Sequence, residues 1–97
     1  KVEAPNITNK FGDTLGIQMY EVTIKAGDSV LLHAHPDYTL YIAEGGTIRI
    51  TPKDGAAQVV EFKTGSGFIS PAGIHAGKNI GSSTIKLIAT NIYRARP

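Results

Sequence analysis

The sequence contains no cysteine, which excludes disulfide bonds, thiolate metal ligands and a cysteine nucleophile together. It also lacks any apolar run that approaches the roughly 20 residues of a membrane-spanning helix, and any hydrophobic segment of the signal-peptide type. The net charge is only +2, and the lysines and arginines are scattered instead of forming a basic stripe with interleaved aromatic residues. We therefore expect no membrane or nucleic-acid partner, and a cytoplasmic location.

Helical segments are missing as well. No window longer than about ten residues combines helix formers, apolar spacing of three and four, and freedom from glycine and proline. Short stretches rich in β-branched and aromatic residues are instead separated by turns, and the chain has 11 glycines and 5 prolines. This pattern predicts an all-β protein, an antiparallel sandwich or barrel. We expect residues 1–14 to be an irregular lead-in, followed by strands over 15–25, 29–34, 38–43, 47–51, 57–63, 67–70, 75–80 and 82–93.

The length of 97 residues predicts one domain, residues 1–97. A core of this size is small, and many such chains gain stability by dimerising, so we expect a homodimer. Residues 15–25 or the last strand would supply the edge for pairing. The dipeptide Asp54-Gly55 predicts a hairpin, because Asp-Gly readily adopts the positive φ angles of tight hairpin turns. Gln18 shares a face with the apolar residues of the first strand, and Met19 is expected in the core.

The three histidines of the chain fall in two short segments. His33 and His35 are two residues apart, so on a strand they point to the same face. His75 follows a turn that contains Pro71 and Gly73. Neutral imidazole is the commonest metal ligand in proteins, so we predict that His33, His35 and His75 hold one metal ion. The competing interpretation is that they are half-buried polar residues, or that they line a pocket without a metal.

The first segment, GDSVLLHAHPDYTLYIAEGG, resembles the first motif of the cupin superfamily. That motif is Gly, five residues, His-x-His, three or four residues, Glu, six residues, Gly. Gly27, His33, His35 and Gly46 stand at its anchor positions. Thr39 stands where the family has its metal-binding Glu, and a neutral hydroxyl is a poor ligand beside a carboxylate. Asp37 is a possible replacement, although a carboxylate in a loop is more often a turn acceptor.

The second segment, GSGFISPAGIHAGKN, resembles the second cupin motif, which is Gly, five residues, Pro-x-Gly, two residues, His, three residues, Asn. Gly65, Pro71, Gly73, His75 and Asn79 stand at its anchors. The segment is one residue shorter than the motif between Gly73 and the histidine. Asn79 is expected to bond turn backbone rather than to act in the site.

The resemblance implies a cupin-type conical β-barrel, also called a double-stranded β-helix or jelly roll, which is usually dimeric. It also implies a divalent ion (Zn, Fe, Ni or Mn, with Cu also compatible) held in the barrel by the motif histidines, beside a small-molecule ligand or substrate. Tyr38 and Tyr41 point to opposite faces of their strand, so one of them could face the cavity, although core packing is the default role of such a residue. Gln18 could also reach the cavity. One hypothesis for the function is a metal-dependent dioxygenase or isomerase. The alternatives are a non-catalytic protein that binds a metal or a small ligand, and a structural dimerisation module with an empty barrel.

Overall fold

The computed structural model describes residues 7–95 of the chain. Over these residues the chain forms strands and no helix, as the sequence predicts. The strands are β1 (Ile7–Thr14), β2 (Ile17–Ile24), β3 (Ser29–His35), β4 (Asp37–Glu44), β5 (Gly46–Pro52), β6 (Gln58–Phe62), β7 (Gly67–Ser70), β8 (Gly73–Asn79) and β9 (Ile85–Ile92). No helix able to cross a membrane is therefore found in this part of the chain.

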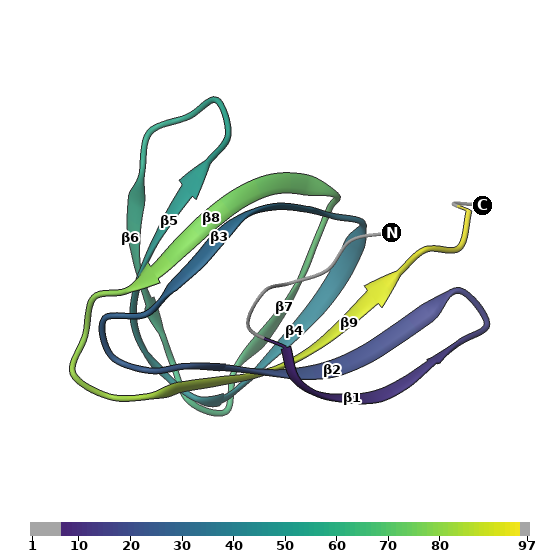
Figure 1. The fold of residues 1–97 in the computed structure, drawn as a ribbon, viewed down its shortest axis with the longest axis horizontal. Coiled ribbons are helices and arrows are strands. Elements are labelled where there is room, and N and C mark those ends of the chain that lie inside the picture. The colour runs from purple at the N-terminus through teal and green to yellow at the C-terminus, as the bar shows by residue number, and fades with distance from the viewer. Residues whose placement is uncertain (1–6, 96–97) are drawn as a thin grey trace.

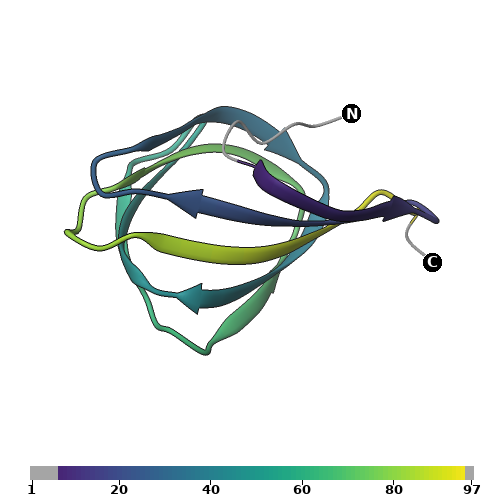
Figure 2. The ribbon, with the colours of Figure 1, turned by 60° about the horizontal axis from the view of Figure 1, so that its bottom comes forward.

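The strands form two antiparallel sheets that face each other (Figure 1). One sheet has five strands in the order β1-β2-β9-β4-β7, and the other has four in the order β3-β8-β5-β6. After β2 the chain passes from one sheet to the other at almost every connection, and only β5 and β6 follow each other within a sheet. This alternation is the double-stranded β-helix expected from the sequence. Figure 2 shows how the strands close around a common interior while the β1–β2 hairpin projects from one end.

The core lies between the sheets and follows from strict alternation along two strands. On β9 the residues Ile85, Leu87 and Ala89 point inward and are buried. They pair with the inward residues of β2, and the pair Ile24 and Ile85 is 1% and 0% exposed. A period of two places successive side chains on opposite faces, so one face of each strand supplies the core.

The structure corrects several predictions at the first hairpin. Residues 7–14 were expected to be irregular, but they form β1, which pairs with β2. Residue 15 was expected in a strand, but Leu15 and Gly16 form the turn, with φ angles of 57° and 71°. Met19 was expected in the core, but it lies on the outer face of β2 and is 44% exposed. The side chains of β2 alternate between the two faces of the sheet, and Met19 is at a position that faces solvent.

Two further predictions need correction. The segments proposed as pairing edges became β2 and β9, which are both interior strands of the five-stranded sheet, because β1 covers β2. The hairpin at Asp54-Gly55 is present between β5 and β6. The reason given for it, that Asp-Gly supplies positive φ angles, is wrong. Gly55 is not among the glycines with positive φ in the described chain, and the loop is longer than the two-residue turn that requires such angles.

Candidate metal centre and ligand cavity

A bulge in β3 decides where its histidines point. Between the paired residues Val30↔Gly77 and His33↔His75, β3 uses three steps where β8 uses two. Leu31 and Leu32 occupy the irregularity and are 67% and 57% exposed. A bulge adds one residue and re-aims the side chains that follow it. Val30 and His33 have opposite parity, so the bulge is what allows both to face the interior.

The three predicted ligands lie together at one end of the interior. His33 pairs directly with His75 on the neighbouring strand β8. The ring centroid of His75 lies 4.9 Å from that of His33 and 4.6 Å from that of His35, and the other two centroids are 6.1 Å apart. All three rings line one cavity. Sequence reasoning therefore placed these residues in the same site, although they come from segments about forty residues apart.

Main-chain carbonyls orient two of the rings. Nδ1 of His33 lies 2.7 Å from the carbonyl oxygen of Leu31, in the bulge, and Nδ1 of His35 lies 2.8 Å from that of Pro36. A ring that donates its Nδ1–H to a carbonyl keeps the lone pair on Nε2, and metal-binding histidines commonly have such a second partner. The bulge thus supplies both the direction of His33 and the acceptor that fixes its tautomer.

Burial favours the neutral form of two histidines. It lowers the pKa of His75 to about 4, with smaller contributions from the charges of His35 and His33. The pKa of His35 is also lowered, mainly by burial and further by the charge of His33, while its hydrogen bond to Pro36 opposes the shift. Both rings are therefore uncharged at neutral pH, which is the form that binds a metal ion.

The donor set and its electrostatics fit a borderline divalent cation, but the arrangement of the side chains does not yet form a site. Across residues 7–95, no group of three or more His, Cys, Asp or Glu side chains is arranged so that it could hold an ion. The metal assignment therefore stays a prediction.

The cavity beside the histidines is mostly apolar and has a volume of about 100 Å³. Its polar contributions come from the histidines and from Tyr20, Tyr38 and Asn91, and within residues 7–95 no Asp, Glu, Lys or Arg lines it. The apolar lining belongs to both sheets and consists of Val22, Ile24, Val30, Leu40, Ile48, Ile50, Phe62, Phe68, Ala76, Gly77, Leu87 and Ala89. A space of this kind suits a small, mainly apolar ligand.

Neither substitute for the missing Glu lies in this cavity. The chain changes sheets at Pro36, so the parity of β3 does not continue into β4. Tyr38 faces the cavity, and its ring centroid lies 4.4 Å from that of His35. The next residue, Thr39, is on the opposite face of β4 and does not line the cavity. The Oδ1 of Asp37 accepts a hydrogen bond of 2.9 Å from the backbone N–H of Ala72. Asp37 thus serves the turn before β8, the more common role that sequence analysis gave it.

The expectation for Asn79 is confirmed. Its side chain is fully buried, and its Nδ2 donates to the carbonyl oxygens of Ile24 and Ser83 at 2.9 and 2.8 Å. Its Oδ1 accepts from the N–H of Gly81 at 3.0 Å. Asn79 therefore holds together the loops at the end of the barrel opposite the histidines, and it does not line the cavity.

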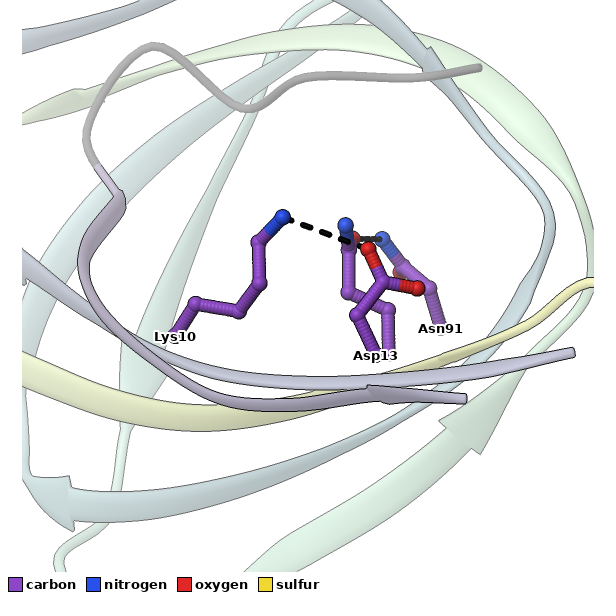
Figure 3. A network of polar contacts seen from close by, with 4 residues as sticks. Lys10, Asp13 and Asn91 are labelled. Atoms are coloured by element: carbon purple, nitrogen blue, oxygen red, sulfur yellow. Dashed lines mark hydrogen bonds and ion pairs between the residues drawn. The ribbon is translucent and has the colours of Figure 1, made fainter. Parts of the chain in front are cut away.

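On the opposite sheet, sequence reasoning named Tyr38, which lines the cavity, and Gln18, which does not, but it missed Asn91. Asn91 is 2% exposed and lines the cavity. It accepts from the Tyr20 hydroxyl at 3.2 Å and donates to Oε1 of the buried Gln18 at 3.1 Å. Figure 3 shows Asn91 in this contact, with the Lys10–Asp13 ion pair of β1 in the same view. The available signal was the polar residue at an inward position of the last strand, where the alternation predicts an apolar one.

Solved structures of cupin domains are similar to this fold. A cupin domain from Bordetella pertussis Tohama I matches with a TM-score of 0.81 and 17% identity, over 97% of this chain and 94% of that one. A cupin superfamily protein from Desulfitobacterium hafniense DCB-2 matches with a TM-score of 0.69 and 20% identity, over 97% of this chain and 79% of that one.

An uncharacterised protein with a double-stranded β-helix domain, from Klebsiella pneumoniae, matches with a TM-score of 0.70 and 16% identity, over 87% of this chain and 73% of that one. No protein-family model matches the chain, and no curated protein matches its sequence. The likeness establishes the fold, and a fold of this kind hosts many activities.

Proposed function

Since the chain has the cupin fold, we propose that it binds a small molecule in the cavity, beside a divalent metal ion held by His33, His35 and His75. The observation that carries the proposal is the gathering of three imidazoles on one wall of an apolar cavity. The hydrogen bonds at Nδ1 of His33 and His35 support the proposal, because they leave the Nε2 lone pair free to bind a metal ion. The lowered pKa of His35 and His75 supports it as well, because it favours neutral rings. Zn, Fe, Ni and Mn are the candidate ions.

When bound, such an ion would supply open coordination positions with Lewis-acid or redox chemistry. The residues of the chain have separate tasks. The histidines hold the ion, and the apolar walls formed by both sheets exclude water and bury the body of the ligand. The enzymatic form of the proposal is a metal-dependent dioxygenase or isomerase that acts on a small molecule.

A non-catalytic binding protein is the second candidate, and one observation favours it. The part of the chain that the structure describes contributes no carboxylate and no lysine to the cavity lining. Apart from the histidines, no side chain of this lining is suited to act as a general base near neutral pH. An enzyme that depends on proton transfer would have to use the ligand itself or an imidazole.

Elemental analysis of protein purified without a histidine tag and without added metal tests the ligand assignment. We expect one equivalent of a divalent ion in the wild type, and a large loss of occupancy in His33→Ala, His35→Ala and His75→Ala. Tyr41→Ala is the matched control, because Tyr41 lies on the outer face of β4 and is 50% exposed. Full occupancy in any of the three histidine variants would contradict the assignment. Metal-free protein in repeated preparations, with unchanged stability of His75→Ala, would favour an empty barrel.

The identity of the ion separates the enzyme from the binding protein. Iron together with oxygen uptake on a panel of small apolar substrates would support the dioxygenase. Turnover without oxygen uptake would support the isomerase, and redox-silent zinc without turnover would support the binding protein.

A further inference from the structure

The sheet opposite the histidines carries a row of polar residues at one level of the cavity. In the register of the five-stranded sheet, Asn91 on β9 lies between Gln18 on β2 and Tyr38 on β4. The next inward row is Tyr20, Ala89 and Leu40, and beyond it the inward residues are apolar. Tyr38 contacts the ring of His35, so this polar row lies at the same end of the cavity as the histidines.

Asn91 is held rigidly in this row and keeps one donor for another partner. Its Oδ1 accepts from the Tyr20 hydroxyl, and one N–H of its amide donates to Gln18. A side-chain amide has two N–H donors, and among residues 7–95 the second N–H of Asn91 has no protein acceptor. Turning both amides over would reverse the two bonds and still leave one Asn91 N–H. A buried donor without an acceptor is energetically unfavourable, which favours a ligand or a water molecule there.

The composition of the lining restricts what the acceptor can be. Among residues 7–95, no Asp, Glu, Lys or Arg lines the cavity, so these side chains offer no charge to balance a charged group beside Asn91, and burying an unbalanced charge is costly. An uncharged acceptor avoids this cost whether or not the ion is bound. The volume of about 100 Å³ is smaller than the roughly 150 Å³ of an apolar cavity that admits benzene. Benzene has six non-hydrogen atoms, so a compact ligand of no more than about six is the appropriate size.

We propose that Asn91 is a ligand-binding residue that donates a hydrogen bond to the oxygen of a small uncharged molecule with an apolar body and a carbonyl group. Tyr20 and Gln18 are positioning residues, because they fix the amide of Asn91 in the cavity wall. The inference rests on the proposed function in assigning the cavity as a ligand site. It does not depend on the metal ion.

A pair of probes tests the inference on protein treated with a chelator. Cyclopentanone and methylcyclopentane each have six non-hydrogen atoms and differ in the carbonyl oxygen. NMR titrations in sealed tubes give Kd for both, and the readout is Kd of methylcyclopentane divided by Kd of cyclopentanone. Asn91→Leu keeps the size of the side chain and removes its donor, so we expect this ratio to fall about tenfold, the contribution of one buried hydrogen bond. Tyr41→Phe, on the outer face, should leave it unchanged.

Tyr20→Phe is the second variant, and it decides the matter alone if Asn91→Leu does not fold. It removes only the hydroxyl that holds Oδ1 of Asn91, and we expect the ratio to fall about threefold. A ratio that stays at the wild-type value in the folded variants, with both affinities reduced equally, would show a packing role and overturn the inference while the ligand site stands. A wild-type protein that binds neither probe would overturn the ligand site itself. Metal analysis of the histidine variants is a separate result, so the two failures can be told apart.

Discussion

At the scale of single residues, His75 makes stability depend on pH. Its pKa is about 4 in the folded chain and has an ordinary value of 6.5, so between these values the unfolded chain binds more protons than the folded one. Stability is then fully present above about pH 6.5 and is lost as the pH falls toward 4. The lowered pKa of His35 acts in the same direction.

Thermal unfolding of the metal-free protein between pH 4 and 8 measures this effect. As the pH is lowered from about 6.5, we expect the melting temperature of the wild type to decrease. The melting temperature of His75→Gln should decrease less steeply over the same range. The difference between the two proteins isolates His75 from the carboxylates, which titrate in the same way in both. Parallel curves would contradict the assignment.

A second prediction at this scale concerns Asn79. Its removal would leave three backbone groups, those of Ile24, Ser83 and Gly81, without their bonds in a buried place. We expect Asn79→Ala to lower the free energy of unfolding by about 3 kcal/mol. Asn79→Asp should cost a similar amount, because a carboxylate cannot donate to the two carbonyl oxygens. Urea unfolding measures both, and an effect of Asn79→Asp below about 1 kcal/mol would contradict this account.

At the scale of elements, the bulge of β3 should support the site through the carbonyl oxygen of Leu31, which lies 2.7 Å from Nδ1 of His33. Deleting Leu32 would remove the extra residue and leave Val30 and His33 two positions apart, so both could still face the interior on a regular strand. The Leu31 carbonyl would then no longer be held beside His33, and we expect the affinity for the metal ion to fall about tenfold. Leu32→Ala keeps the bulge and should keep the affinity, since Leu32 is 57% exposed. An unchanged affinity in the deletion variant would show that the bulge does not orient His33.

The turn between β1 and β2 offers a stabilising substitution. Leu15 has a φ of 57°, a conformation that costs an ordinary L-residue roughly 1–2 kcal/mol, and its side chain is 77% exposed. Asn is favoured before Gly in such two-residue turns, so Leu15→Asn should raise the free energy of unfolding by about 0.5–1 kcal/mol. Leu15→Ala is the control, and an equal gain from both would indicate that the benefit comes from removing an exposed apolar side chain.

These elements also show how far the sequence can predict the structure. The strands β2, β4 and β9 are evident because their segments are rich in β-branched, aromatic and other apolar residues. The paired motifs indicated that the three histidines share a site. Leu15 gave no turn signal, and without the turn β1 could not be recognised as a separate strand. Asn91 was missed because its role depends on Tyr20 and Gln18, partners about seventy residues away that only the register of β2 and β9 brings close.

At the scale of the whole molecule, the homodimer stays a prediction, and the structure changes where its interface should be sought. The edge strands of the two sheets are β1, β7, β3 and β6. Ile69 on β7 is 81% exposed and Leu31 on β3 is 67% exposed, so these edges offer more apolar surface than the interior strands. Light scattering after gel filtration should give twice the chain mass of 10.3 kDa, and the mass of a single chain would contradict the prediction.

Among the strands of residues 7–95, β3 is the last of its sheet, so His33 and His35 lie on a segment bonded to one neighbour, β8. An ion shared by β3 and β8 would hold this edge of the sheet together and stabilise it against local opening. The interior strand β9 would gain little such stabilisation. Amide hydrogen exchange should therefore slow on β3 when metal is added and change little on β9. The dissociation rate of the ion would then be set by the frequency of local opening at this sheet edge, and not by the access of water to the interior of the barrel.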